Sequence, residues 1–361
     1  MEKIFEITQA QKEYLNEFMN KVSRSFAVVV ACIEEPLRAY MATAYLICRV
    51  ADNIEDCQRP AAWKQARFAE LSQLLEEPAL APDVLSGWDR EEWPGLTSDE
   101  REQMRLESGL SLWQIYALIP DDARTSIRRW ASAMAEGMEH LEDPQHDPSW
   151  ITRDGVQMLC DEEDYNRYCY FVAGTVGHMV TELVIGHYGL TDCVADSLLS
   201  TCEACGRGLQ KTNIVKDFAK DLARGVSYLP DTWMREAERA PLSLAGAPAE
   251  WKRKVLGNVM DELDESVDYV LALTYSAAGY RIASLLCLLP AYQTILLAAQ
   301  RQELLFTPDH YVKISRATMS QCLLDAQSML ADNAALLRYS REIKSAVASL
   351  FNGVGCIQNE L

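Results

Sequence analysis

Apolar residues recur every three to four positions along most of the chain, which is the spacing of one buried face of an α-helix. We therefore predict helices over the following ranges: 10–33, 36–56, 99–118, 122–140, 161–188, 193–221, 250–276, 278–302 and 317–350. Alternating patterns typical of strands are nearly absent. Stretches rich in loop-forming residues at 77–95, 143–149 and 239–248 are short enough to be loops within one body. The pattern predicts one all-α domain over residues 1–361.

The most apolar stretch runs from Ile282 to Ala299, and its length approaches that of a membrane span. Pro290 and the polar residues after it interrupt the stretch, so we interpret it as two adjoining core helices with a break at the proline. The beginning of the sequence lacks the apolar region of a signal peptide. We expect a cytoplasmic protein and leave a peripheral membrane contact open.

The charge and the cysteines narrow the classes of function. A formal net charge of −19 argues against a nucleic-acid partner, because so acidic a surface repels a phosphate backbone. The eleven cysteines lack the small, loop-rich context of a disulfide scaffold, which fits a reducing compartment. Cys202 and Cys205 have C-x-x-C spacing, but no second pair follows at zinc-finger spacing, so we interpret them as buried thiols.

Three carboxylates gather near the end of the predicted helix 36–56. Asp52 and Asp56 are four residues apart and Asp52 and Glu55 are three apart, so all three share one helix face. Carboxylates so placed repel one another unless a cation lies between them. Mg²⁺ suits this role, because it takes oxygen ligands and completes its shell with water and substrate phosphates.

A second acidic pair lies in the predicted helix 193–221, where Asp217 and Asp221 again face the same way. The run 211–213 (Lys-Thr-Asn) is costly to bury in an otherwise apolar helix unless a ligand is present. Further polar and cationic residues of this helix are Gln210, Asn213, Lys216 and Lys220.

A single D-x-x-x-D pair on a helix is usually a solvated face. Two such clusters, each embedded among apolar residues of one helical chain, favour a functional interpretation instead. Antiparallel helices can aim the clusters at each other across a cavity and hold a diphosphate through bridging metal ions. That arrangement stabilises a leaving pyrophosphate and so promotes ionisation of an allylic carbon.

Several segments between residues 20 and 235 form a joint signature in order and spacing. These segments are Ser23-Arg-Ser-Phe-Ala27, Tyr45 with Arg49 and Asp52-Asn-Ile-Glu-Asp56, Ala135-Glu-Gly-Met138, Tyr168-Cys-Tyr-Phe-Val-Ala-Gly-Thr-Val-Gly177, and Leu209-Gln-Lys-Thr-Asn-Ile-Val-Lys-Asp217. The set resembles the squalene/phytoene synthase family. Its Gln-Lys-Thr-Asn form is more similar to squalene synthases than to many phytoene synthases. Beyond residue 250 the match weakens, although 312–316 (Val-Lys-Ile-Ser-Arg) resembles a late basic motif.

The resemblance implies the all-α isoprenoid synthase fold, a single helical bundle around a deep apolar cavity. It implies that Mg²⁺ and diphosphate are bound at the cavity mouth by the carboxylates of Asp52, Glu55, Asp56, Asp217 and Asp221. Substrate contacts are implied for Arg24, Phe26, Tyr45, Arg49, Val172, Gln210, Asn213, Lys216, Lys220 and Arg224.

The resemblance also implies roles for two aromatic residues and two late basic ones. Tyr168 matches the family tyrosine proposed as acid and base for the proton lost when a cyclopropane forms. Phe26 would offer its ring face to a carbocation. From periodicity alone, core packing of Phe26 and a buried hydrogen-bonded hydroxyl for Tyr168 are preferred. Lys313 and Arg316 of the late basic motif are expected to bind NADPH.

The implied reaction joins two molecules of farnesyl diphosphate head to head with Mg²⁺. Presqualene diphosphate forms first, and NADPH then reduces it to squalene, as in isoprenoid biosynthesis toward sterols or hopanoids. One alternative is a dehydrosqualene or phytoene synthase that needs no NADPH, which the stretch 224–230 (Arg-Gly-Val-Ser-Tyr-Leu-Pro) favours. The other is a degenerate, non-catalytic helical partner protein.

Lys220 departs from the family pattern, which usually has an acidic residue at this position. A charged lysine does not ligate magnesium. Three interpretations follow: Asp217 and Asp221 suffice, Lys220 pairs directly with a phosphate, or the site is weakened and the second half-reaction is altered. The prenyl chain length and the oligomeric state are left open by the sequence.

Overall fold

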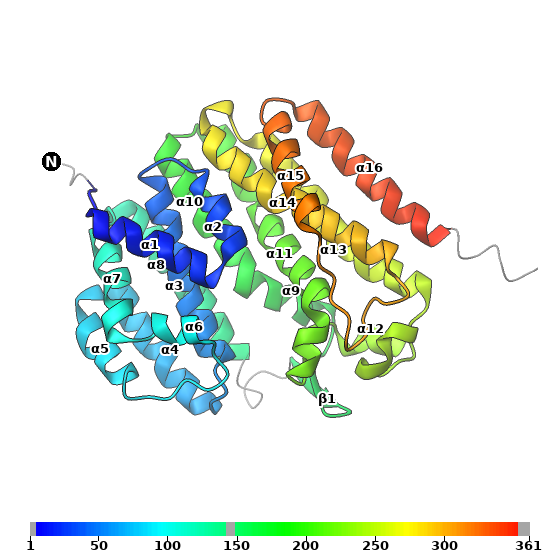
Figure 1. Ribbon diagram of the computed structural model, residues 1–361, viewed down its shortest axis with the longest axis horizontal. Helices are drawn as coiled ribbons and strands as arrows, with labels where there is room; N and C mark the ends of the chain where they lie inside the picture. The colour runs from blue at the N-terminus through cyan, green and yellow to red at the C-terminus, as the bar shows by residue number, and fades with distance from the viewer. Residues whose placement is uncertain (1–4, 142–148, 353–361) are drawn as a thin grey trace, which may run out of the picture. The chain divides into compact units, whose positions relative to one another are not determined.

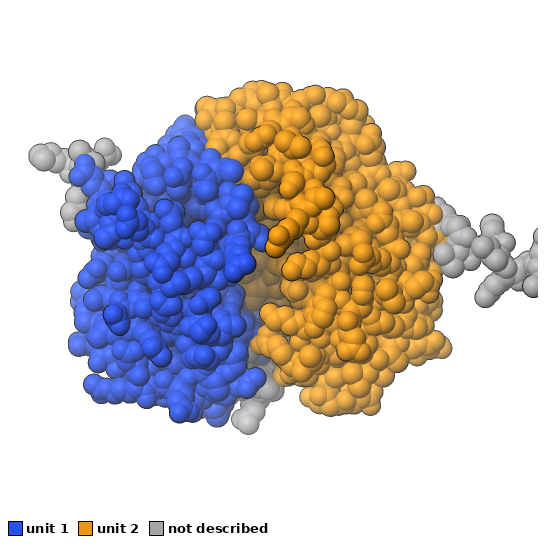
Figure 2. All heavy atoms as spheres, viewed as in Figure 1, with its two compact units in different colours: residues 1–146, 175–195 blue, residues 147–174, 196–361 orange. Residues whose placement is uncertain are grey.

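The computed structural model describes residues 5–141 and 149–352, and this described part contains sixteen α-helices and one small three-stranded sheet (Figure 1). The predicted all-α class is therefore confirmed. The chain divides into two compact units, which Figure 2 colours separately. Unit 1 comprises residues 1–146 and 175–195, and unit 2 comprises residues 147–174 and 196–361. The expectation of a single domain stays a prediction.

Unit 1 is built around one helix, α3 (Leu37–Asp56), which contacts α1, α4, α7, α8 and α10. Its apolar residues are buried on nearly every side, which is typical of a helix at the centre of a core. The other elements of unit 1 are α1 (Gln9–Val22), α2 (Arg24–Ala31), α4 (Ala61–Glu76), the 3₁₀ turn η1 (Pro78–Leu80), α5 (Ala81–Trp88), α6 (Ser98–Gln103), α7 (Leu106–Leu118), α8 (Asp121–Leu141) and α10 (Thr175–Tyr188).

In unit 2, α13 (Ala249–Ala272), α14 (Ala278–Gln300) and α16 (Asn333–Asn352) contact one another, and α15 (Arg316–Met329) packs on α14 (Figure 1). The long helix α11 (Asp192–Ala223) begins in unit 1 and runs mostly through unit 2. The remaining elements are α9 (Glu162–Cys169), a π-helical turn η2 (Tyr170–Gly174), α12 (Asp231–Glu236) and the 3₁₀ turns η3 (Pro241–Gly246) and η4 (Tyr275–Ala277).

A small sheet precedes α9 in the chain. Strand β1 (Trp150–Arg153) pairs antiparallel with β2 (Val156–Leu159), and β2 pairs parallel with the two-residue β3 (Val226–Ser227). The hairpin turn is Asp154-Gly155, with φ angles of +54° and +79°. Both central residues of this tight turn adopt the left-handed region, for which the Asp-Gly sequence is favoured.

Helix boundaries differ from the sequence prediction wherever a cap interrupts an apolar pattern. The predicted helix 10–33 is two helices that meet at Ser23, whose side chain accepts the Phe26 N–H at the start of α2. The predicted helices 99–118 and 317–350 are likewise each two helices. Apolar spacing continues across all of these breaks, so periodicity alone does not locate them.

Two interpretations of proline-containing segments were wrong. Helix α14 continues through Pro290 as one helix that is buried on most sides, and the Thr294 hydroxyl donates to the Pro290 carbonyl at 2.7 Å. The predicted loop 77–95 contains the helix α5. Helices α4 and α12 were not predicted, and the apolar residues of α4 do not gather on one side. The predicted loop 143–149 lies outside the described residues except for its last position.

Two helical stretches of the described chain are long and apolar enough to cross a membrane, Glu162–Tyr188 and Tyr275–Gln300. In the most apolar 18 residues of each stretch, 61% of Tyr275–Gln300 and 39% of Glu162–Tyr188 is buried inside the protein. For Tyr275–Gln300 this burial favours a core helix, as the sequence predicted.

Candidate active site

The first acidic cluster lies at the end of α3 in unit 1, where Arg49 binds two acids. One guanidinium nitrogen of Arg49 donates to Asp52 at 3.0 Å, and another donates to Glu100 of α6 at 2.6 Å. Glu100 also accepts the backbone N–H of Thr97 at 2.8 Å in a capping box at the start of α6. Arg49 is therefore fixed in place by neighbours from α3 and α6.

Negative charge is in excess around Asp52. Burial raises the pKa of Asp52 from 3.8 to about 6; Arg49 opposes this shift, and the charges of Asp56 and Glu100 add to it. Arg49 is shared between Asp52 and Glu100, so it only partly offsets the cost of burying the ionised Asp52. The site is therefore one at which an added cation stabilises the ionised carboxylate.

Asn53, within the same motif, points away from this cluster and holds α3 to α6. Its fully buried amide donates to the Gln103 side chain at 3.2 Å, and Gln103 in turn donates to the Leu46 carbonyl at 2.7 Å. Sequence reasoning missed Asn53, Gln103 and Glu100. The Thr97-x-x-Glu100 pattern of a capping box was a usable signal for the last of these.

The predicted pair Phe26 and Tyr45 meet in unit 1. Their rings stack with centroids 4.6 Å apart and planes inclined by 24°. The Tyr45 hydroxyl hydrogen-bonds with Ser23, and burial raises the pKa of Tyr45. Ser23 thus joins the start of α2 to α3, and the next residue, Arg24, is exposed with no ion-pair partner in the described part of the chain.

Tyr168 lies in an aromatic cluster of unit 2. Its buried ring stacks on the ring of Tyr228, with centroids 4.5 Å apart. The Trp150 ring approaches both in an edge-to-face arrangement, and its centroid lies 6.4 Å from that of Tyr168 and 5.9 Å from that of Tyr228. The three rings come from α9, β1 and the segment after β3. Sequence reasoning assigned no role to Tyr228 or Trp150, because only tertiary contacts bring them to Tyr168.

The segment after Tyr168 contains the predicted residue Val172 and is a π-helical turn. This turn packs backbone to backbone on α11, since a Cβ at Gly206 would lie 2.0 Å from the Ala173 carbonyl oxygen. Only glycine at Gly206 permits such an approach. Single π turns are frequent at functional sites.

The second acidic cluster interleaves acids with lysines along α11. The Lys216 ammonium lies 2.9 Å from the Asn213 side-chain oxygen and 3.2 Å from Asp217. Lys220 is exposed and has no ion-pair partner in residues 5–141 and 149–352. Helical spacing places Lys220 on the same side as Asn213 and Asp217. The other predicted residues of this helix end are half-buried or exposed: Gln210, Asp221 and Arg224.

Lys211 does not lie on the side of α11 that carries Asn213, Asp217 and Lys220. It is 2% exposed and its ammonium lies 2.8 Å from Glu262 of α13, while Thr212 bonds back to the Gly208 carbonyl. The expectation that the run 211–213 requires a ligand was therefore wrong for Lys211, which has a protein partner. Sequence reasoning missed Glu262, which lies 51 residues further along the chain.

The late basic pair lies at the start of α15. Lys313 and Arg316 are both exposed and have no ion-pair partner among the described residues, and Ser315 between them caps the helix by accepting the Thr318 N–H at 3.0 Å. Free cationic heads of this kind fit the phosphate groups of a nucleotide.

The carboxylates of both clusters fit Mg²⁺ in ligand chemistry, since they offer oxygen atoms, and the pKa of Asp52 is raised although Arg49 lies beside it. Within the described residues, no group of three or more acidic, histidine or cysteine side chains is close enough to form a metal site by itself. A bound ion would therefore complete its coordination with oxygens from a phosphorylated substrate.

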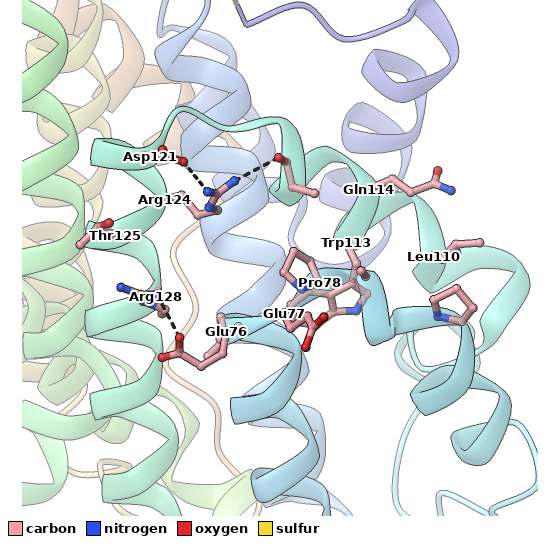
Figure 3. A pocket seen from close by; sticks show the side chains of 14 residues that line it. Glu76, Glu77, Pro78, Leu110, Trp113, Gln114, Asp121, Arg124, Thr125 and Arg128 are labelled. Carbon is pink, nitrogen blue, oxygen red and sulfur yellow. Dashed lines mark hydrogen bonds and ion pairs between the residues drawn. The ribbon is translucent and has the colours of Figure 1, made fainter. Parts of the chain in front are cut away.

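A separate cavity of about 660 Å³ lies between α4, α7 and α8 of unit 1 (Figure 3). None of the predicted site residues lines it. Its two arginines are already paired, Arg124 with Asp121 and Arg128 with Glu76. The deep apolar cavity that was expected to hold the prenyl chains stays a prediction.

Comparisons with known proteins agree with the motifs. The sequence model of the squalene/phytoene synthase family matches residues 19–318. The squalene synthase of Saccharomyces cerevisiae is 26% identical over 342 residues, covering 92% of this chain and 71% of that protein. A bifunctional lycopene cyclase/phytoene synthase of Colletotrichum graminicola is 27% identical over 296 residues, covering 79% of this chain and 45% of that protein.

The structure of TcSQS in complex with a ligand is similar in fold, with a TM-score of 0.77 at 20% identity, covering 98% of this chain and 94% of that one. The family match covers most of the chain, and the described helices have the arrangement that this structure has. The chain therefore belongs to the squalene/phytoene synthase family of prenyltransferases and has the all-α isoprenoid synthase fold.

Proposed function

We propose that this chain condenses two molecules of farnesyl diphosphate head to head into presqualene diphosphate and then reduces that intermediate to squalene with NADPH. Condensation of prenyl diphosphates is the chemistry of the family to which the chain belongs. The choice of squalene is supported by relatives such as the Saccharomyces cerevisiae squalene synthase, which matches 92% of this chain.

The charge balance at the end of α3 is the observation that carries the proposal. Burial raises the pKa of Asp52, and the charges of Asp56 and Glu100 add to this shift, so a bound cation would stabilise the ionised carboxylate. Bound Mg²⁺ would stabilise the diphosphate as a leaving group. Its ligands would be Asp52, Glu55, Asp56, Asp217 and Asp221.

The cationic residues would hold the phosphate oxygens directly. Arg49 is already oriented by Glu100 and Asp52, so little side-chain entropy is lost when it contacts substrate. Lys220 is exposed on the same side of α11 as Asp217, which supports a direct contact of its ammonium with phosphate. The other residues proposed for this role are Arg24, Gln210, Asn213, Lys216 and Arg224.

Tyr168 would handle the proton lost when the cyclopropane forms. The rings of Tyr228 and Trp150 give it an apolar setting, and exclusion of water matters because water traps allylic cations as alcohols. A tyrosine with an ordinary pKa near about 10 is a weak base at neutral pH, so released pyrophosphate would take the proton onward. In unit 1, the stacked rings of Phe26 and Tyr45 offer a π face to a cation.

NADPH would supply the hydride of the second half-reaction, and Lys313 and Arg316 would contact its phosphates. The Gln-Lys-Thr-Asn form of the motif, which includes Lys211, favoured the squalene branch in the sequence. Because Lys211 forms a buried ion pair with Glu262, it gives no information about whether hydride is used. A dehydrosqualene or phytoene synthase activity without NADPH is therefore the second candidate. The phytoene synthase relative and the stretch 224–230 of the sequence favour it.

We further propose a cytoplasmic location with a peripheral membrane contact for release of the insoluble product. Leu304, Tyr311 and Leu324 are large exposed apolar residues of unit 2 and suit such a contact. Co-sedimentation with phospholipid vesicles tests this: protein that stays in the supernatant at all lipid concentrations contradicts it.

The test of function is incubation of the purified protein with farnesyl diphosphate and Mg²⁺, with and without NADPH, followed by identification of the extracted lipids. Squalene only with NADPH, and presqualene diphosphate without it, is the expected result. Dehydrosqualene in both conditions assigns the second candidate. Absence of product from farnesyl and geranylgeranyl diphosphate contradicts both and favours a non-catalytic partner protein.

A further inference from the structure

A ladder of alternating charges joins α11 to α13 inside unit 2. Glu262 of α13 accepts two hydrogen bonds from the Arg207 guanidinium, from Nε at 3.0 Å and from Nη2 at 3.1 Å, and Lys211 lies 2.8 Å from one of its oxygens. Arg207 also bonds to Glu203, one turn earlier on α11. We call Glu203, Arg207, Lys211 and Glu262 the charge ladder. Its two acids balance its two cations.

The charge ladder ends on a buried tyrosine of α9. The Lys211 ammonium lies 5.3 Å from the ring centroid of Tyr165, which is fully buried. The Tyr165 hydroxyl has no hydrogen-bond partner in the described chain, so the contacts of its ring are what hold it. A cation over an aromatic ring is strongest where water is excluded, as it is here.

Tyr165 lies one turn before Tyr168 on α9, and that helix is attached along its length, including by the stacking of Tyr168 on Tyr228. At its start, Glu162 accepts from Trp233 at 3.2 Å and from Asn258 at 3.1 Å. At its end, the π-helical turn η2 touches the α11 backbone at Gly206. Between these two, at the middle of the helix, the Tyr165 ring contacts both the Lys211 ammonium and the Trp233 ring, whose centroid lies 5.3 Å away.

We propose that Glu262 is a positioning residue: through Lys211 and Tyr165 it fixes α9, and with it Tyr168, on the helix that carries Asp217 and Asp221. A buried lysine without its acid would turn away from the ring, because an uncompensated charge is costly in a dry interior. This role rests on the proposed function, in which Tyr168 and the two aspartates act on one substrate.

The test uses the double variant Lys211→Met/Glu262→Gln. Removing both charges leaves no unpaired ion, so the protein is expected to fold, whereas Glu262→Gln alone strands a buried lysine. Amide hydrogen exchange of residues 162–169 should be faster by about tenfold, because α9 has lost the charged one of its two central attachments. In turnover of farnesyl diphosphate, kcat should fall by roughly 10- to 100-fold while KM stays within about threefold.

Unit 1 offers a matched control, since Glu182 pairs with Arg129, whose guanidinium lies 5.2 Å from the Trp130 ring. The variant Arg129→Met/Glu182→Gln removes the same kinds of group and should leave the exchange of residues 162–169 and kcat unchanged. A Glu262 variant with exchange or kcat equal to that of this control overturns the positioning role. If wild type makes no prenyl product, the exchange result by itself decides the positioning, and only the proposed function fails.

Discussion

The two acidic clusters share their spacing but differ in charge balance. At the end of α3, Asp52 has one guanidinium within reach, which it shares with Glu100, and its pKa is raised to about 6. On α11, by contrast, Lys216 lies 3.2 Å from Asp217, and Lys220 lies on the same side of the helix. Identical D-x-x-x-D patterns therefore produce one site with a buried acid of raised pKa and one in which exposed lysines lie among the acids.

This difference suggests that the two clusters have different roles in binding the metal ion and the diphosphate. At the α3 cluster, burial disfavours the ionised form of Asp52, which an added cation would stabilise, whereas the α11 cluster offers cationic side chains to a phosphate directly. We expect the first cluster to dominate the magnesium dependence and the second to contribute more to affinity for diphosphate. The predictions below test this comparison, starting with the largest effect.

Asp52→Asn should lower turnover of farnesyl diphosphate by at least about 1,000-fold, because it removes the carboxylate for which no other group substitutes. Asp217→Asn should also abolish measurable turnover at low Mg²⁺, but excess Mg²⁺ should restore part of it. The measurement is product formation over a Mg²⁺ titration, with Asp122→Asn as an exposed control on α8. Full recovery of turnover in both variants at high Mg²⁺ would contradict the proposed difference between the two clusters.

The raised pKa of Asp52 predicts a pH-dependent stability of the metal-free protein. A shift from 3.8 to about 6 corresponds to at most roughly 3 kcal/mol. The folded state binds this proton more tightly than the unfolded state. The stabilising contribution is therefore present below about pH 4 and is lost as the pH rises through about 6.

Asp52→Asn should therefore raise the free energy of unfolding of the metal-free protein at pH 8 and have little effect at pH 4. Chemical denaturation at both pH values measures this, and adding Mg²⁺ with pyrophosphate should stabilise wild type but not the variant. A variant less stable than wild type at pH 8 would show that the Arg49 contact outweighs the burial of Asp52.

Lys220→Glu makes the second cluster similar in charge to the first. It should weaken binding of pyrophosphate at low Mg²⁺ by about tenfold, since a charge-assisted contact is lost, and make binding more dependent on Mg²⁺. Titration calorimetry with pyrophosphate at two Mg²⁺ concentrations measures both effects, with Lys220→Gln separating loss of the cation from gain of the acid. Unchanged binding in both variants would place Lys220 outside the phosphate site.

Lys216→Gln should have the smallest effect. Lys216 and Asp217 are each more than a third exposed, and such pairs contribute less than about 1 kcal/mol to stability. We expect the thermal unfolding midpoint to shift by no more than about 2 °C. A larger loss of stability would mean that the α11 cluster is held together by its lysines even without substrate.

Much of the fold follows from local sequence. The ranges 36–56, 122–140 and 193–221 agree with α3, α8 and α11 to within one or two residues, because long amphipathic or buried segments have strong periodicity. The hairpin at Asp154-Gly155 had a usable turn signal, but its strands are only four residues long and carry little pattern of their own.

The residues proposed for the site were named from the sequence alone, whereas their neighbours in space were not. Spacing places Asp52, Glu55 and Asp56 on one face, and the motifs assign the chain to its family. The stacking of Phe26 on Tyr45 and of Tyr168 on Tyr228 was not predictable, because each pair comes from separate segments whose packing leaves no local pattern.

The sequence by itself determined most of the helices and the faces on which the acids lie, since both depend on residues close together in the chain. It also determined the family, through the order and spacing of several motifs. Only the tertiary structure decided the charge state of Asp52, which depends on burial and on Glu100, 48 residues further along. It also decided that Lys211 is an internal ion-pair partner of Glu262 and not a ligand-binding residue. Burial and pairing with residues distant in the sequence determine the pKa values and ion pairs of charged groups, and neither can be predicted from the local spacing of residues.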